Sequence, residues 1–398
     1  MARRGWLILL ALCFVATTVV AQQTTSGSQI RYTPLDYAAI MRQLERASQP
    51  TLWQRLTKGF SNQPTKEDKA FNLSGNIGIG YSQEASAMVV ASGVAQYPLA
   101  MGATPSYTSL TAMVSLNGFY RLQTSGKAHL SAKDRIEYNL GGGVMPIRFW
   151  GLGYEAAEKN TRSKYTRNSI DLSAEYIRKI VAGLSLGCGV DYLYATARDI
   201  EPLAESYLLS SGITTTSAQT LGFNLMAEYD GRRFNNNLTS GCLVRVKSSF
   251  HPQSLGDHST SLWHIEAAAN YFQPVWRGGM IALDLYADMW SWNTPWLFWA
   301  KMGGESRMRG YYYGKYTDRK MATAQLELRQ TIFGPISGVV WGGAGSVFAS
   351  HRLIDLKELL PNYGVGIRVG SNGTTSLRID YGFGRHSSGL VININEAF

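Results

Sequence analysis

The stretch Leu390-Val391-Ile392-Asn393-Ile394-Asn395-Glu396-Ala397-Phe398 closes the sequence. Because side chains alternate between the two faces of a strand, the two isoleucines share a face with the final aromatic residue, and the asparagines share the other. A strand of this pattern that ends in an aromatic residue is typical of the last strand of a bacterial outer-membrane β-barrel. We therefore expect Ile392, Ile394 and Phe398 to form a C-terminal barrel signal.

The first 21 residues have the pattern of a secretory signal peptide. Arg3 and Arg4 form a charged start, residues 6–20 form an apolar core, and small residues precede Gln22. This apolar stretch is short for a membrane span, and no other reaches about 18 residues. The sequence thus predicts an exported chain without a transmembrane helix.

The composition suits a barrel better than a soluble domain. Mean hydropathy is -0.13 although 45% of residues are hydrophobic. Single-residue alternation in barrel strands keeps total hydropathy near zero in this way. The formal charge is +10, but no run of lysines and arginines concentrates it. We expect that charge at the rim and in the lumen, partly facing lipid headgroups, and expect no nucleic-acid partner.

Residues 22–70 predict a short N-terminal amphipathic helical segment and a polar linker. Thr33 and Pro34 fit a helix start, and apolar residues follow at helical spacing up to Pro50. A second short amphipathic stretch covers residues 51–60. The segment could lie on the periplasmic membrane face, cap the barrel mouth or act as a plain tether.

From Phe71 onward the sequence alternates between apolar and polar residues. Residues 221–230 and 281–289, for example, place aliphatic side chains on one face and acidic ones on the other. This favours an all-β fold, a transmembrane antiparallel β-barrel with a polar lumen. At roughly 20 residues per strand and connection, residues 71–398 have room for about sixteen strands. A soluble β-sandwich would also alternate, but strands this long and an export signal argue against it.

The connections between the predicted strands differ in length at the two ends of the barrel. Those at residues 333–336 and 371–374 are short and fall on the periplasmic side. Longer ones, near residues 154–164, 197–217, 251–259 and 349–360, all fall outside. This asymmetry is typical of outer-membrane barrels.

The longest loop rich in glycine and aromatic residues spans residues 296–320. It contains Gly303-Gly304-Glu305-Ser306-Arg307-Met308-Arg309-Gly310-Tyr311 and precedes a strand with Glu327-Leu328-Arg329. On this motif, the Glu-Leu-Arg strand and the C-terminal strands, the chain resembles the BamA/TamA family of outer-membrane assembly barrels, also called the bacterial surface antigen family. The resemblance covers residues 71–398.

In that family this loop folds back into the lumen, and its arginine pairs with acidic groups on the inner wall. The resemblance implies that Met308, Arg309, Gly310 and Tyr311 form the loop tip, and that Glu327 is the wall carboxylate. The alternation independently puts Glu327 on the lumen face of its strand. An arginine of the loop that is buried in the lumen needs such a carboxylate, because an unpaired buried charge lowers stability. Asp284 and Asp288, on the strand that leads into the loop, are further candidate partners.

The sequence departs from the family in two places. Gly343 stands where the family usually carries an aspartate, so that Asp284, Asp288 or Asp380 would have to replace it. Residues 22–70 also leave no room for the periplasmic POTRA repeats of the family. We therefore expect a barrel of this family that lacks POTRA domains.

The resemblance implies a part in the insertion, assembly or translocation of proteins at the outer membrane. Gly75, Gly78 and Gly80 make the first strand a weak edge, which could part from the last strand and pair with a client strand. The alternative is a passive pore, or a barrel subunit that works through a periplasmic or lipoprotein partner. The loop arginine would either rigidify a plugged barrel or take part in opening the seam.

No catalytic pattern stands out. The six histidines lack a Gly-x-Ser-x-Gly, His-x-x-x-His or cysteine partner nearby, and no phosphate loop or zinc spacing occurs. We expect no enzymatic activity and no cofactor or metal.

Overall fold

The computed structural model of the protein describes residues 71–99, 104–235, 238–333, 336–349, 356–371 and 374–393. The predicted signal peptide (1–21), the segment 22–70, and Ile394 and Phe398 of the expected C-terminal signal lie outside the described residues.

Sixteen long strands form the wall in the described part of the chain. They are β1 (Asn72–Ser82), β2 (Ser86–Tyr97), β3 (Ser106–Ser115), β4 (Tyr120–His129), β5 (Asp134–Phe149), β6 (Ser163–Lys179), β7 (Leu184–Arg198), β8 (Ser217–Asp230), β10 (Leu238–His251), β11 (Leu262–Trp276), β12 (Gly279–Trp290), β15 (Lys320–Phe333), β16 (Ile336–Phe348), β17 (Leu360–Ser371), β18 (Thr374–Gly384) and β19 (Ser387–Asn393). The short β9 (Arg233–Asn235) adds to β10.

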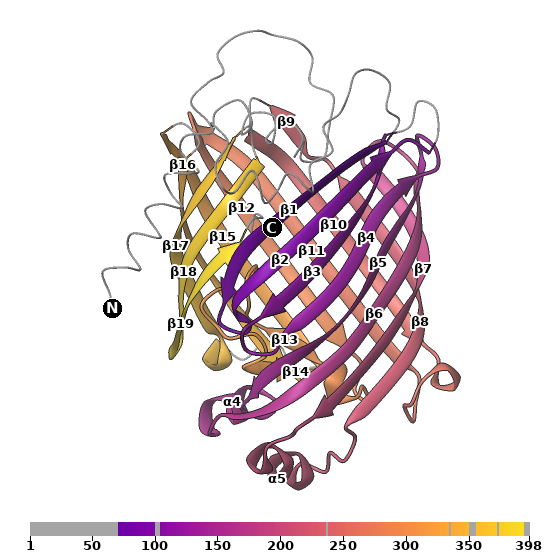
Figure 1. Ribbon diagram of the computed structural model, residues 1–398, viewed down its shortest axis with the longest axis vertical. Coiled ribbons are helices and arrows are strands. Elements are labelled where there is room, and N and C mark those ends of the chain that lie inside the picture. The colour runs from indigo at the N-terminus through magenta and orange to yellow at the C-terminus, as the bar shows by residue number, and fades with distance from the viewer. Residues whose placement is uncertain are drawn as a thin grey trace.

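Each wall strand pairs antiparallel with the next wall strand along the chain, and β1 pairs with β19 to close the barrel (Figure 1). The pairing of β1 with β2 runs from Asn72 to Ser82, and within the described residues β1 meets β19 at Tyr81 and Ile392. The predicted antiparallel barrel of about sixteen strands is confirmed.

The two faces of the wall differ as the alternation predicts. Val114 and Leu225 point outward and are 61% and 69% exposed, as suits side chains that face lipid. Asn224 and Glu327 sit on strands of the same wall and are buried in the interior. A polar lumen and an apolar exterior therefore follow directly from the period of two.

The long connections gather at one end of the barrel (Figure 1). They carry α4 (Tyr154–Lys159), α5 (Pro202–Ser210), the 3-10 turns η1 (Gln253–Leu255), η2 (Trp296–Phe298) and η3 (Leu356–Glu358), and the pair β13 (Ala300–Met302) and β14 (Tyr316–Asp318). Across the described residues, no helix has the length and apolarity needed to cross a membrane.

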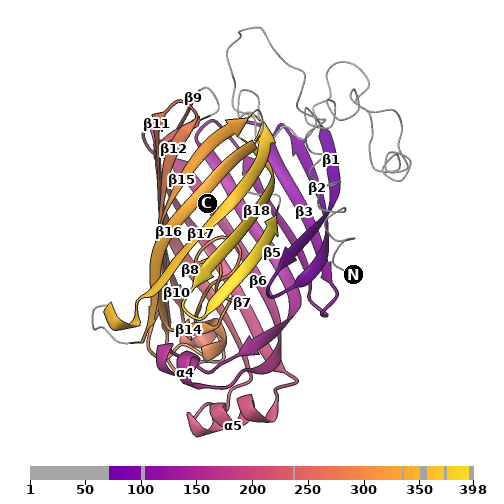
Figure 2. The ribbon, with the colours of Figure 1, turned by 90° about the vertical axis from the view of Figure 1, so that its left-hand side faces the viewer.

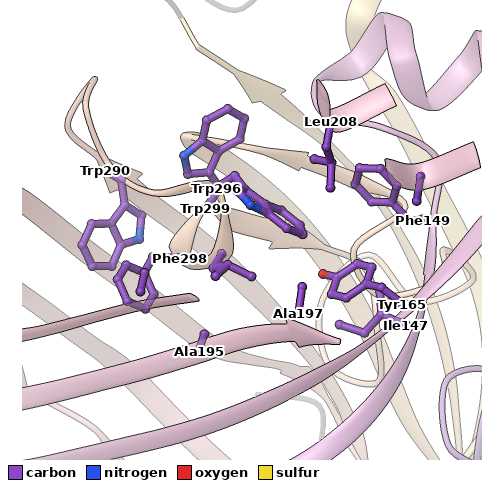
Figure 3. Packing of buried hydrophobic residues seen from close by; sticks show 13 residues of the cluster. Ile147, Phe149, Tyr165, Ala195, Ala197, Leu208, Trp290, Trp296, Phe298 and Trp299 are labelled. Carbon is purple, nitrogen blue, oxygen red and sulfur yellow. The ribbon is translucent and has the colours of Figure 1, made fainter. Parts of the chain in front are cut away.

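The largest apolar core lies under the connection between β12 and β15, at this same end. Trp296, Leu297, Phe298 and Trp299 pack against inward-facing residues of β5 to β8, among them Phe149 (Figure 3). A second buried cluster joins Met302, Met308, Tyr311, Tyr316, Met321, Val347, Leu360, Ala157 and Ala300. The two clusters fix this connection inside the barrel wall.

Candidate functional site in the lumen and at the seam

The connection between β12 and β15, residues 291–319, is called the lumen loop below. Its backbone turns sharply at Gly303, Gly304 and Gly310, where φ is 105°, 103° and 103°. Glycine adopts such positive φ without steric cost. Met308 is a non-glycine residue at φ 52° and is completely buried, so the loop tip is held in a conformation that the surrounding packing must impose.

Arg309 lies at this tip, fully buried between two strands of the wall. Its Nη1 donates to Asp380 Oδ2 of β18 at 2.7 Å, and its Nη2 donates to Glu327 of β15. The guanidinium also stacks on the ring of Trp341 of β16, 3.7 Å from the ring centroid. One loop side chain thus connects three strands of the wall.

The carboxylates around Arg309 have further basic partners. Arg329 Nε donates to the second oxygen of Glu327 at 2.8 Å, and Arg368 pairs with Asp380. Arg309, Glu327 and Asp380 have no exposed side-chain surface. Because the site is fully buried, loss of one partner would leave a charge uncompensated and would lower the free energy of unfolding by roughly 3 to 5 kcal/mol.

Hydrogen bonds from side chains to backbone carbonyls fix the tip against β17 and β19. Tyr311 Oη donates to the carbonyl of Pro361 at 2.6 Å, and the hydroxyl of Ser387 donates to the carbonyl of Gly310 at 2.6 Å. The side chain of Asn362 donates to the carbonyl of Arg309. Burial raises the pKa of the Tyr311 phenol to about 12, so this donor keeps its proton at physiological pH.

The other predicted acidic partners lie elsewhere. Asp284 binds Arg307 of the lumen loop, with Nε to Oδ2 at 2.7 Å and Nη2 to Oδ1 at 3.1 Å, so its prediction as a partner of Arg309 was wrong. Asp288 contacts His264 Nε2 at 2.9 Å, so its prediction as a partner of the loop arginine Arg309 was wrong. The register explains this, because Asp288 is paired with Glu266 of β11, next to His264 and away from the loop tip.

Gly343, where the family aspartate was expected, is paired with Gln325 on β15. A Cβ built there would lie 2.4 Å from the carbonyl oxygen of Ala324, so the backbone leaves no space for a side chain. The second carboxylate therefore comes from β18, as Asp380.

Several residues of the site were not singled out in the sequence. They are Trp341, Asn362 and Arg307, together with Gly382 and Gly384, where an added Cβ would meet the backbone of Arg309 and the ring of Tyr311. The alternation carried a signal for two of them, because Gly382 and Gly384 share the lumen face of β18 with Asp380. The stacking partner Trp341 and the amide of Asn362 require the register of three neighbouring strands, which sequence alone does not give.

The lumen loop also touches both sides of the seam, the junction between β1 and β19. Tyr313 N donates to Glu84 Oε1 at 2.7 Å, in the turn between β1 and β2. On the other side, Asn393 of β19 donates to Glu305 of the loop. Burial, and then the nearby Glu84 carboxylate, raise the pKa of Glu305 above its ordinary value.

The structure places Gly75, Gly78 and Gly80 on β1, opposite Gly93, Val90 and Met88 of β2. Beside Gly80, the described chain pairs β1 with β19 at Tyr81 and Ile392. Figure 2 faces this junction, with the yellow C-terminal strands on one side and the indigo β1 on the other.

Residues 71–392 match the Omp85 superfamily domain. The chain belongs to the Omp85 superfamily. As an Omp85 barrel, it is an integral protein of the outer membrane. The resemblance to BamA/TamA barrels that the loop motif indicated is thereby confirmed.

Two solved structures resemble this Omp85 barrel. BamA from Haemophilus ducreyi lacking POTRA domains 1-3 has 14% sequence identity and a TM-score of 0.57, over 96% of this chain and 81% of that one. CdiB from Acinetobacter baumannii has 13% identity and a TM-score of 0.51, over 82% of this chain and 60% of that one. At this identity the likeness supports the fold alone. No curated protein matches the sequence.

Proposed function

We propose that this Omp85 barrel inserts or translocates proteins at the outer membrane, by parting β1 from β19 and offering the freed edge to a client strand. The observation that carries the proposal is that the lumen loop contacts both sides of the seam. Its Tyr313 N donates to Glu84 beside β1, and Asn393 of β19 donates to its Glu305. An edge opened within lipid leaves N–H and C=O groups without partners, and a client strand would satisfy them.

The wall away from the seam is tied together by ion pairs that skip strands. Arg135 of β5 pairs with Glu228 of β8 at 2.7 Å, although β6 and β7 lie between these strands. Arg245 of β10 pairs with Glu137 of β5 at 3.2 Å. Such a network favours a rigid half of the barrel, so that deformation would concentrate at the seam.

The lumen loop would keep its shape while the seam opens. Arg309, Gly310 and Tyr311 attach it to β15 and to β17 through β19, on the C-terminal side of the seam. Beside β1, on the other side of the seam, Glu84 accepts one hydrogen bond from a backbone N–H of the loop. Opening would therefore release the loop at Glu84 and leave it attached at Arg309 and in the apolar cluster against β5 to β8.

The proposed role requires no catalytic residue, cofactor or metal. Its partners would be outer-membrane lipid and client outer-membrane proteins, with a periplasmic or lipoprotein partner as a further candidate. A passive pore is the competing function, and it predicts a large and constant conductance in a planar bilayer.

The test is to reconstitute the pure barrel in liposomes and to time the folding of an unrelated outer-membrane barrel added from urea. Empty liposomes and liposomes with an Arg309→Ala variant serve as comparisons. We expect faster folding with the native barrel than with empty liposomes, and loss of the gain in the variant. Folding at the rate of empty liposomes would rule out insertion by this chain alone.

A further inference from the structure

A hollow lies apart from the lumen loop tip, at the end of the barrel that carries the long connections. It has a volume of about 530 Å³ and is formed where the connections after β5, β7 and β12 meet. Tyr207, Trp292, Trp296 and Trp299 line it together with polar residues. Its size and mixed lining fall in the range of small-molecule sites.

The floor of this hollow is held rigid by hydrogen bonds. Trp296 Nε1 donates to the carbonyl of Thr215 at 2.8 Å, and Trp299 Nε1 donates to that of Thr294 at 2.7 Å. Both indoles are buried beside the large apolar cluster (Figure 3). The hollow is therefore formed before any ligand arrives.

Arg319 lies at the rim with its guanidinium between two indoles. The distances from its Cζ to the ring centroids of Trp292 and Trp299 are 4.3 and 4.2 Å. Its Nε donates to the carbonyl of Trp292 at 2.7 Å. In the described part of the chain, no hydrogen bond engages its two terminal nitrogens, so two donors are fixed in place without an acceptor.

Asp318 supplies an acceptor in the lining of the same hollow. Its side chain is 7% exposed, and its Oδ1 accepts from the backbone N–H of Arg319 at 2.7 Å. Within the described ranges it forms no ion pair, and burial raises the pKa of this carboxyl. Trp292 is 62% exposed, which leaves a flat apolar ring in the lining of the same hollow.

From this arrangement we infer that the hollow binds a saccharide unit. A sugar ring has an apolar C–H face, which suits stacking on the indole of Trp292. The hydroxyl groups of that ring, and of the sugar units linked to it, can accept from Arg319 and donate to Asp318. The site would take a surface glycan, either free or attached to a lipid of the outer leaflet. This binding is independent of whether the seam opens.

Aromatic residues at a barrel rim can also act as anchors in the lipid headgroup region. A lipid anchor would need the exposed ring of Trp292 alone. It would not need a preformed hollow that is also lined by a fixed guanidinium and a buried carboxyl. The two roles therefore predict different effects of substitutions at Arg319.

The experiment uses the full chain in nanodiscs and two probes: free core oligosaccharide released from rough lipopolysaccharide, and the intact rough lipopolysaccharide. Binding is measured by calorimetric titration and by saturation-transfer NMR for the native chain, Trp292→Ala and Arg319→Gln. Trp276→Ala is the control, because this tryptophan is similarly exposed, at 54%, and ends β11 next to a short turn at the opposite end of the barrel. Heat-shifted electrophoretic mobility verifies that each variant is folded.

We expect binding that weakens at least tenfold in both Trp292→Ala and Arg319→Gln and is unchanged in Trp276→Ala. Binding of both probes would mean that the sugar alone is recognised, and binding of the intact lipid only would mean a lipid-linked glycan. The inference is overturned if neither probe binds, if both site variants bind as well as the native chain, or if Trp276→Ala weakens binding as much as Trp292→Ala.

Discussion

Gly310 of the lumen loop and Gly382 of β18 lie so close together that neither has room for a side chain. A Cβ on Gly310 would lie 2.6 Å from the carbonyl carbon of Gly382, and one on Gly382 would lie 2.4 Å from the carbonyl oxygen of Arg309. This approach lets Arg309 reach Asp380, two residues before Gly382 on the same lumen face. The depth of the loop is thus set by two glycines as well as by charge.

The first prediction concerns this contact. Gly382→Ala would force the loop backbone away from β18, and we expect a loss of about 1 to 3 kcal/mol in unfolding free energy, as for other overpacked interiors. Gly342→Ala is the matched control, because a Cβ at Gly342 meets nothing within 4 Å, and it should change stability by less than about 0.5 kcal/mol. Urea unfolding in detergent, followed by electrophoretic mobility, measures both. Equal effects of the two variants would show that the close approach is unimportant.

The second prediction concerns the guanidinium of Arg309. Lysine cannot contact Glu327 and Asp380 at once in the forked geometry of arginine, so Arg309→Lys should cost roughly 3 kcal/mol. The control is Arg178→Lys, since that side chain is 56% exposed in its ion pair with Asp134 and should be nearly neutral. The measurement is the denaturant midpoint of each variant compared with that of the native chain. A stability of Arg309→Lys like that of the native chain would mean that the buried pairs do not hold the loop.

The third prediction is a pH dependence at Glu305, a loop residue outside the wall strands. Its pKa is raised in the folded barrel, so the fold favours the protonated form, and stability falls as pH rises above the pKa of the unfolded chain. Glu305→Gln removes this cost and keeps an acceptor for Asn393. We expect the variant to be more stable than the native chain at pH 7, and expect the difference to vanish near pH 4.

The control for this experiment is Glu155→Gln, whose carboxylate is 76% exposed in a surface pair with Lys159. Its effect on stability should be small at both pH values. If Glu305→Gln gave the same stability difference at pH 4 and pH 7, ionisation of Glu305 would not be the cause.

The barrel could be predicted from the sequence because its signal is local. In residues 221–230, for instance, each charge and each aliphatic residue can be assigned to a face by counting in twos. Glu327 was found for the same reason, since its phase and the loop motif agree.

The rest of the site depends on register between distant strands. Asp380 lies 71 residues from Arg309, and only the pairing of β15 through β18 brings them together. Asp288 has the same lumen phase as Asp284 but sits four residues further along β12, where it contacts His264. Alternation gives the face of a strand and not the height along it, so it could not separate these aspartates.

If client insertion requires the seam between β1 and β19 to open, a disulfide across the seam should block it. In a Cys188→Ala, Cys242→Ala background, Tyr81→Cys and Ile392→Cys place two thiols at the paired seam position. The control pair is Val89→Cys with Val114→Cys, which joins β2 to β3 at another lipid-facing pair.

Client folding in liposomes is then timed for both oxidised barrels, before and after reductant. We predict that the seam disulfide abolishes the acceleration, that reductant restores it, and that the control disulfide has no effect. Full acceleration with the seam covalently closed would show that insertion does not require the seam to open.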